Sequence, residues 1–219
     1  MRRLCIFDLD GTLLDTVADL AQATNYALSM LGYPVHPIEN YKIYCGRGIY
    51  NLFRAALPED GRTEENVLRM KGFFLEHYSA HMTDLTRPYP GIVEMMEDLC
   101  SKGAYIALAS NKYQEGAEKL MRHFFPEVPF VRILGQREGQ PMKPDPRIIE
   151  ECLERCPGLG REDVVYVGDS DVDMQTGAAA SVRTIGVLWG FRSRKELERY
   201  SPYRIVSTPK ELEDAILQN

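Results

Sequence analysis

Carboxylate side chains gather at two places that lie far apart in this chain. Asp8 and Asp10 stand in the run FDLDGT, and Asp169 and Asp173 stand in the run GDSDVD. The spacing of two aims Asp8 and Asp10 the same way if a strand continues, although a turn at Gly11 would separate them. Two such close carboxylates repel each other, which pushes one toward holding a proton. Asp8 could then act as a nucleophile while Asp10 gives and takes a proton. For the first run alone, a solvated or calcium-binding turn is the alternative.

A hydroxyl and an ammonium could complete a site for a phosphoryl group. Ser110 follows an apolar run, and with the backbone N–H groups of Asn111 and Lys112 it could bind phosphoryl oxygens. Lys143 lies in the run PMKPDP, whose prolines stiffen the loop and fix the approach of the ammonium. A serine after a strand is often only a turn residue, and a lysine is often a solvated charge. Both residues therefore indicate a phosphoryl-binding site only in combination with the carboxylates elsewhere in the chain.

The acidic residues also have the chemistry of a magnesium site. Mg²⁺ prefers oxygen ligands and takes one or two carboxylates together with phosphate oxygens of a substrate. Asp8, the main-chain carbonyl of Asp10 and Asp169 can supply such oxygens, and the ion would neutralise charge during phosphoryl transfer. Asp173, one helical turn after Asp169, could orient a metal-bound water or the lysine. We expect Asp171, by contrast, to cap the helix that begins there.

The candidate residues follow short apolar runs that are typical of buried parallel strands. These runs alternate with helical patterns, which predicts an α/β fold with a doubly wound, Rossmann-like parallel sheet. Ligands bind to such sheets beyond the carboxyl ends of the strands, where Asp8, Ser110 and Asp169 are expected. The predicted strands are 4–7, 105–109, 130–134, 164–167, 184–188 and, more weakly, 204–206, and the predicted helices are 92–99, 117–124, 148–153 and 174–180.

One long stretch breaks this alternation, because residues 15–87 contain helical patterns and no convincing strand. We interpret it as an all-helical cap domain inserted after the first strand. Its predicted helices are 15–31, 49–57 and a third that Thr63 can cap. The chain would then consist of an α/β catalytic core of residues 1–14 and 89–219 and a cap of residues 15–88, joined by hinges at 13–16 and 87–91.

A loop inside this cap has the composition of an anion-binding segment. Arg47 lies between Gly46 and Gly48, and glycines on both sides would let backbone and guanidinium approach an anion closely. The loop could reach over the active site to the non-reacting end of a substrate. A solvated arginine between two helices is the alternative, and the sequence leaves both open.

Composition excludes several functional classes. The chain has 219 residues and a net charge of −6, and it lacks the basic stripe that nucleic-acid binding usually needs. No apolar run approaches the roughly 20 residues that span a bilayer, and Met1-Arg-Arg is not followed by a signal peptide. Five cysteines without a CxxC pair indicate reduced thiols. We therefore expect a cytoplasmic protein that binds neither nucleic acid nor membrane.

Together these motifs resemble the haloacid dehalogenase superfamily of phosphotransferases, and the match covers essentially the whole chain. The run DLDGT from Asp8 matches the first motif of that superfamily, Ser110 the second, Lys143 the third, and the GDS run with Asp173 the fourth. The resemblance implies that Asp8 is the nucleophile and Asp10 the acid and base. It also implies the Mg²⁺ ligands Asp8, Asp10 and Asp169.

The helical insert resembles the subfamily that includes phosphoglycolate phosphatases, β-phosphoglucomutases and small pyrophosphatases. The runs SNK from Ser110, GRG around Arg47 and WGFRS from Trp189 look closest to the phosphoglycolate phosphatase branch. That branch commonly has threonine where this chain has Ser110, and the hydroxyl is kept. From their own setting, Trp189 and Phe191 are expected to be packing residues. The resemblance implies substrate contacts for Gly11, Thr12, Arg47, Asn111 and Lys112.

The function that follows from this resemblance is a Mg²⁺-dependent phosphatase acting on a small phosphorylated metabolite, with phosphoglycolate as the leading candidate. Dehalogenases of the superfamily do without the second aspartate and the metal, so Asp10 favours phosphoryl transfer. A nucleotidase, a pyrophosphatase and a sugar-phosphate mutase share the motifs and stay open. A non-catalytic binding module would be expected to lack Asp8, Asp10 or Lys143. The chain could be a monomer or a homodimer.

Overall fold

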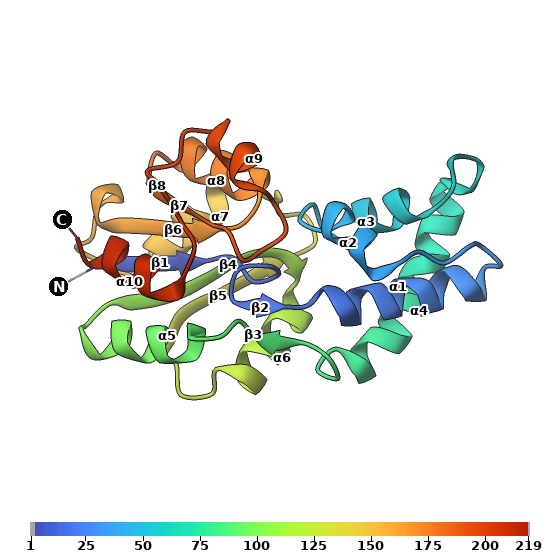
Figure 1. Ribbon diagram of the computed structural model, residues 1–219, viewed down its shortest axis with the longest axis horizontal. Coiled ribbons are helices and arrows are strands. Elements are labelled where there is room, and N and C mark those ends of the chain that lie inside the picture. Colours follow the sequence, from blue (N-terminus) through green and yellow to red (C-terminus); the bar gives the residue numbers. More distant parts are fainter. Residues whose placement is uncertain (1–2, 219) are drawn as a thin grey trace.

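The computed structural model describes residues 3–218, and a six-stranded parallel sheet forms the centre of the protein. The strand order is β5-β4-β1-β6-β7-β8, and helices connect the strands on both faces (Figure 1). This confirms the predicted doubly wound α/β core. The strands are β1 Leu4–Phe7, β4 Tyr105–Tyr113, β5 Phe130–Gln136, β6 Val164–Gly168, β7 Arg183–Val187 and β8 Arg204–Val206. The helices of the core are α5 Ile92–Ser101, α6 Gln114–Phe124, α7 Arg147–Leu153, α8 Asp171–Ala180, α9 Arg194–Glu198 and α10 Pro209–Leu217, with a short 3₁₀ turn at Arg161–Asp163.

The central strand β1 is apolar throughout because both of its faces are covered. Leu4 and Ile6 belong to the core cluster that includes residues of α7 and α8, whereas Cys5 and Phe7 belong to the cluster with α5, α6 and α10. All four side chains are fully buried, as expected for a strand with helices on both sides. The carboxyl end of β1 therefore lies between the ends of β4 and β6, where ligands bind in such sheets.

A lobe of helices stands beside the carboxyl edge of the sheet (Figure 1). Helices α1 and α4 pack against each other along this lobe, and α4 begins after Thr63, whose hydroxyl accepts a hydrogen bond from the backbone N–H of Asn66. The apolar side chains of α4 that recur every three or four residues are buried, which places its hydrophobic face inward. The helices of the lobe are α1 Val17–Met30, α2 Ile38–Tyr44, α3 Ile49–Ala56 and α4 Glu64–His81, with a 3₁₀ turn at Glu59–Gly61.

The two connections between lobe and core form a small ribbon, which corrects the expectation that residues 15 to 87 contain no strand. Strand β2, Leu14–Asp15, pairs antiparallel with β3, Arg87–Pro88. The buried carboxylate of Asp19 accepts hydrogen bonds from the backbone N–H groups of Leu85 and Thr86 and from the Thr86 hydroxyl. The two connections are thus tied to each other, because a buried carboxylate needs several donors.

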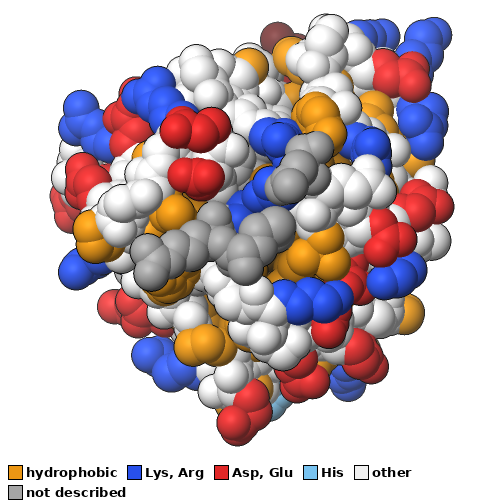
Figure 2. Space-filling model, turned by 90° about the vertical axis from the view of Figure 1, so that its left-hand side faces the viewer, with side chains coloured by type: hydrophobic (Ala, Val, Ile, Leu, Met, Phe, Trp, Pro, Cys, Tyr) orange, Lys and Arg blue, Asp and Glu red, His pale blue; other side chains and the backbone are white. Residues whose placement is uncertain are grey.

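Other elements also extend or add to the predictions. Strand β4 runs on through Tyr113, beyond the predicted end at residue 109, with an irregularity in its pairing to β5 after Ala109. Helices α2, α9 and α10 were not predicted. Among the residues that the structure describes, no helix is both long and apolar enough to cross a bilayer. The end of the core that carries both termini, opposite the lobe, shows acidic and basic side chains interspersed (Figure 2).

Candidate active site

A tight turn after β1 separates the carboxylates of Asp8 and Asp10. The backbone N–H of Asp8 still pairs with the carbonyl of Val167 at 2.9 Å, as in the strand, and the chain then turns so that two N–H groups reach the Leu9 carbonyl within 3.1 Å. Gly11 in this turn has φ of +87°, and a Cβ there would lie 2.4 Å from Asp169 Oδ2. Only glycine fits both the backbone conformation and the space. Asp8 faces the end of the sheet, while Asp10 turns toward the lobe.

Lys143 is the centre of a buried cluster at this end of the sheet. Its Nζ lies 2.8 Å from Asp8 Oδ1 and 2.7 Å from Asp173 Oδ1. The ammonium also donates to the Ala109 carbonyl and the Tyr166 hydroxyl, each at 3.0 Å. Because an ammonium has three hydrogens, the bonds to Ala109, Tyr166 and Asp173 use all of them. Asp8 Oδ1 is thus held close to the ammonium as an ion pair.

Burial and crowding shift the proton affinities of the three carboxyl groups in different directions. Burial, with the neighbouring Asp173 carboxylate, raises the pKa of Asp8 to about 7 against the opposing effect of Lys143. Burial and the Asp173 and Asp8 carboxylates raise the pKa of Asp169 to about 8. Burial also acts on Asp173, but Lys143 and the hydrogen bonds from Ser170 and Tyr166 outweigh it and lower the pKa. Asp173 is therefore the residue that stays ionised most readily.

The carboxyl oxygens of Asp8, Asp169 and Asp173 fit a divalent cation. Oxygens of these three residues lie within 4.8 Å of one another. Both oxygens of Asp173 are already engaged, one by Lys143 and Tyr166 and the other by the N–H and hydroxyl of Ser170. Asp8 Oδ1 is buried and has no hydrogen bond to the described residues. Because each oxygen of Asp173 already has two donors, Asp8 and Asp169 fit the ion better than Asp173 does.

The residues Ser110, Asn111 and Lys112 lie within β4 rather than after it, and all three are buried. The Ser110 hydroxyl faces the pocket beside Asp8 and accepts a hydrogen bond from the backbone N–H of Lys112 at 3.2 Å. Asn111 joins three segments through its side-chain amide. The amide donates to the carbonyl of Lys143 and accepts from the backbone N–H of Lys143, and it also donates to the Gly46 carbonyl at 3.1 Å. Asn111 therefore holds the loop of Lys143 and the lobe in place together.

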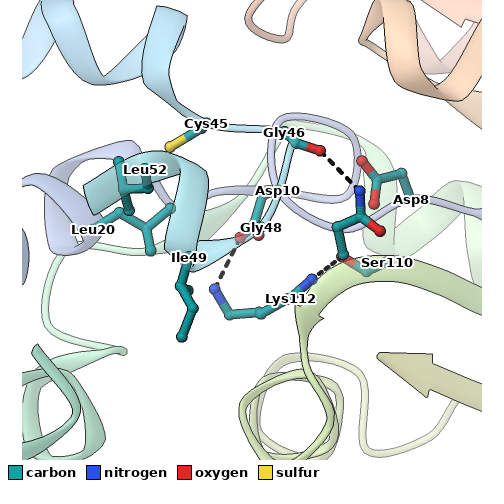
Figure 3. Close-up of a pocket in the computed structure, with 11 residues that line it drawn as sticks. Asp8, Asp10, Leu20, Cys45, Gly46, Gly48, Ile49, Leu52, Ser110 and Lys112 are labelled. Atoms are coloured by element: carbon teal, nitrogen blue, oxygen red, sulfur yellow. Dashed lines mark hydrogen bonds and ion pairs between the residues drawn. The ribbon is translucent and has the colours of Figure 1, made fainter. Parts of the chain in front are cut away.

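A small pocket of about 30 Å³ lies between Asp8 and the lobe (Figure 3). The lobe supplies an apolar wall of Leu20, Cys45, Ile49 and Leu52, and the core supplies the polar side with Asp8, Asp10 and Ser110 to Lys112. Burial raises the pKa of the Cys45 thiol to about 12, so this thiol stays protonated and is a poor nucleophile. The lobe therefore covers the polar side chains of the core and leaves little free volume beside them.

The structure does not bring Arg47, Gly11 or Thr12 into the lining of this pocket. The side chain of Arg47 is 55% exposed and pairs with Asp171 across the boundary between lobe and core. Gly11 and Thr12 contact Asp169 instead, the Thr12 hydroxyl donating to Asp169 Oδ1 at 3.0 Å. The loop of Arg47 does line the pocket, through the backbone of Gly46 and Gly48.

The expectation that Asp171 caps α8 was wrong. Ser170 is the N-cap, and its hydroxyl and the Asp173 carboxylate form a reciprocal capping box. Asp171 is the first residue of the helix and is left free to pair with Arg47, while Arg192 stands 3.7 Å from its other oxygen. Arg192 also donates to the Lys42 and Cys45 carbonyls at the end of α2. These two arginines connect lobe and core.

Trp189 and Phe191 pack against the core as expected, but sequence reasoning missed the hydrogen bonds that their segment makes. The indole N–H of Trp189 donates to the Thr12 carbonyl at 2.9 Å, and the backbone N–H of Phe191 donates to Asp169 Oδ2 at 2.7 Å. Tyr166, which bonds both Lys143 and Asp173, was missed as well. The sequence does contain a signal for Tyr166, which is the one hydroxyl among valines in a predicted buried strand. A buried hydroxyl needs a hydrogen-bond partner, so this residue could have been expected to contact a polar group.

Comparisons with known proteins agree with this geometry. The family model of haloacid dehalogenase-like hydrolases matches residues 5–187. A phosphoglycolate phosphatase of Aquifex aeolicus is 32% identical over 210 residues, which cover 96% of this chain and 94% of that protein. A phosphoglycolate phosphatase of Mesorhizobium japonicum is 29% identical over 208 residues, covering 94% and 91%. The crystal structure of a protein from Lactobacillus delbrueckii subsp. bulgaricus superposes with a TM-score of 0.90 at 33% identity and covers 99% of both chains.

Proposed function

The chain belongs to the haloacid dehalogenase-like hydrolase family, and on that premise we propose that it is a Mg²⁺-dependent phosphatase that hydrolyses a small phosphomonoester through an aspartyl-phosphate on Asp8. The observation that carries this proposal is the buried contact of Lys143 with both Asp8 and Asp173. The ammonium favours the ionised form of Asp8, which is the form that can attack phosphorus.

Asp8, Asp169 and the main-chain carbonyl of Asp10 would hold the cation, with Asp173 outside the set of direct ligands. Asp173 is better placed to orient Lys143, since four hydrogen bonds already occupy its oxygens. When bound, Mg²⁺ offsets the negative charge of the carboxylates and of the phosphoryl group. Thr12 and the backbone of Phe191 keep Asp169 turned toward this place.

The residues around Asp8 can carry both halves of the reaction. The Asp8 carboxylate attacks phosphorus, a new O–P bond forms as the ester P–O bond breaks, and Asp10 gives its proton to the departing oxygen. A water then attacks the aspartyl-phosphate, Asp10 takes its proton, and inorganic phosphate leaves with Asp8 restored. The Ser110 hydroxyl and the Lys143 ammonium bind phosphoryl oxygens as negative charge develops on them.

Phosphoglycolate is the leading substrate, because relatives with that activity align over nearly the whole chain and the pocket is small. We propose that residues 15–88 act as a cap that opens to admit it, as lids in other enzymes do. Arg47 would leave Asp171 to bind the carboxylate of the substrate. The positive φ angles of Gly46, +108°, and Gly48, +77°, mark the places where this loop can turn.

We expect Mg²⁺-dependent phosphate release to be fastest with phosphoglycolate in a panel that also holds a nucleoside monophosphate, pyrophosphate and a hexose 1-phosphate.

Arg47→Ala should raise the KM for phosphoglycolate about tenfold and that for the hexose phosphate less than about twofold, because only the first has a carboxylate to pair with the guanidinium. Asp171→Asn, which frees Arg47, should lower the KM for phosphoglycolate. If none of these esters released phosphate in the presence of Mg²⁺, the proposed phosphatase activity would be refuted. Equal effects of Arg47→Ala on both esters would remove the role of Arg47.

The affinity for Mg²⁺ is expected to rise with pH up to about 8 and to level off above that. The ion binds ionised carboxylates, whereas burial and neighbouring carboxylates raise the pKa of Asp8 to about 7 and that of Asp169 to about 8. Below these values, binding must displace protons. Titration calorimetry in buffers of different ionisation enthalpy should show proton release and at least about tenfold weaker binding near pH 6 than near pH 9, since one pKa unit is a factor of ten. Binding without proton release near pH 6 would contradict these ligands.

A further inference from the structure

A buried lysine joins Asp10 to the helical lobe. The Nζ of Lys112 donates to Asp10 Oδ1 at 3.1 Å and to the Tyr78 hydroxyl at 2.8 Å. The side chain of Lys112 is only 2% exposed. The three residues come from three places in the chain, namely the turn after β1, strand β4 and helix α4. The contact of Lys112 with Asp10 can be seen in Figure 3.

Packing in the lobe fixes the position of Tyr78. Its ring stacks on Phe74 with centroids 4.9 Å apart, stands edge-on to Tyr113 at 6.4 Å, and lies 4.7 Å from the Lys112 ammonium. Tyr78 is fully buried, so its hydroxyl needs a partner, and Lys112 is that partner. Any movement of α4 away from β4 would therefore break a bond that neither residue can replace with water while it stays buried.

The contacts of Asp10 lie on one of its two oxygens. Oδ1 accepts from the Thr16 hydroxyl at 2.7 Å and from Lys112 at 3.1 Å. Oδ2 accepts no hydrogen bond from the described residues, and Asp10 lines the pocket. Two donors on one oxygen fix the plane of the carboxyl group, because rotation about its last bond would lose both. The second oxygen is thus presented in a defined direction for proton transfer.

We propose that Tyr78 is a positioning residue for Asp10 and acts through Lys112, so that acid catalysis in the core depends on contact with the lobe. The inference rests on the proposed role of Asp10 as the acid toward the leaving oxygen. With α4 against β4, Lys112 is held between Tyr78 and Asp10, and Asp10 is oriented. With α4 displaced, Lys112 loses its second partner and Asp10 its fixed direction. In this proposal the role of Lys112 is to orient Asp10 and not to bind the substrate.

Three esters separate this role from the others that Lys112 and Tyr78 could have. Phosphoglycolate has a poor leaving group and a carboxylate, glycerol phosphate has a poor leaving group and no carboxylate, and p-nitrophenyl phosphate has a leaving group that departs without a proton. Tyr78→Phe, which keeps the ring, should lower kcat/KM about three- to tenfold for both alkyl esters and less than about twofold for the aryl ester, since one hydrogen bond is lost. Lys112→Met should give the same pattern with larger factors.

Matched variants test whether any contact between lobe and core would do. Lys119→Met removes a second lysine of the core that donates to the lobe, at the Ser79 carbonyl, and Tyr26→Phe removes a hydroxyl bonded to Glu76 within the lobe. Both should leave kcat/KM unchanged for the three esters. Thermal melts of all four variants show whether each is folded. Asp10→Asn should show the strongest difference between alkyl and aryl esters.

Each other outcome overturns the proposal in a recognisable way. A loss confined to phosphoglycolate would make Lys112 a reader of the substrate carboxylate. Equal losses for all three esters, or a matching loss in Lys119→Met, would reduce the Tyr78 contact to general support of the lobe. If Asp10→Asn affected alkyl and aryl esters alike, the acid itself would be misassigned. Absence of phosphate release by the unmodified protein would instead refute the proposed function.

Discussion

Asp8→Asn is expected to lower phosphate release by more than about 10³-fold, because an amide cannot attack phosphorus and no other group can form the covalent intermediate. The Cys45 thiol, which also lines the pocket, has a pKa raised by burial to about 12 and stays protonated. A single-turnover assay with excess enzyme should detect neither released phosphate nor phosphorylated protein. Turnover within tenfold of the unmodified enzyme would eliminate Asp8 as the nucleophile.

The same variant should be more stable than the unmodified protein when no cation is present. Burial and the Asp173 carboxylate raise the pKa of Asp8 to about 7, so at pH 8 the folded state holds a costly negative charge that asparagine removes. We expect the melting temperature at pH 8 to rise by a few degrees, about 2–4 °C for each kcal/mol in a domain of this size. Asp15→Asn, at an exposed position in the same segment, should change neither activity nor melting temperature. A lower melting temperature for Asp8→Asn would mean that structural damage explains the lost activity.

The core of the fold could be predicted because its signals are local. The runs 4–7 and 164–167 are short, apolar and followed by polar residues, and the structure has β1 and β6 there. Since the carboxyl ends of strands in a parallel sheet meet along one edge, the same runs predict that Asp8 and Asp169 lie close together. The order of the motifs also predicts Lys143 as a site residue, although the local sequence PMKPDP does not determine the position of its ammonium group.

What sequence reasoning missed depends on contacts between distant segments. The polar run after Ala109 has the composition of a turn, yet Ser110 to Lys112 continue β4, because buried partners elsewhere satisfy their polar groups. Strands β2 and β3 have two residues each and exist only because they pair with each other. Arg47 pairs with Asp171 because Ser170 takes the capping position. Each outcome is decided by competition for a partner, which residue type and spacing do not encode.

Lys143→Met is expected to lower the free energy of unfolding by about 3–5 kcal/mol, the range for breaking a buried ion pair by removing one partner. The ammonium is fully buried between Asp8 and Asp173, and without it these carboxylates and Asp169 would repel each other with no positive charge among them. Urea unfolding at pH 8 without a cation should show the loss, and phosphate release should fall as well. Near pH 5 the penalty should shrink, because the carboxyl groups can then take up protons.

Two further variants decide whether charge compensation is the cause. Lys143→Met combined with Asp173→Asn removes one charge of each sign and should recover part of the lost stability, as expected for two residues in direct contact. Lys210→Met removes an exposed lysine that pairs with exposed Asp214 and with Glu213, a buried carboxylate that keeps its ion pair with Lys102, so it should have little effect. If Lys143→Met were no more destabilising than Lys210→Met, charge compensation by the buried ammonium would not be what stabilises this cluster of carboxyl groups.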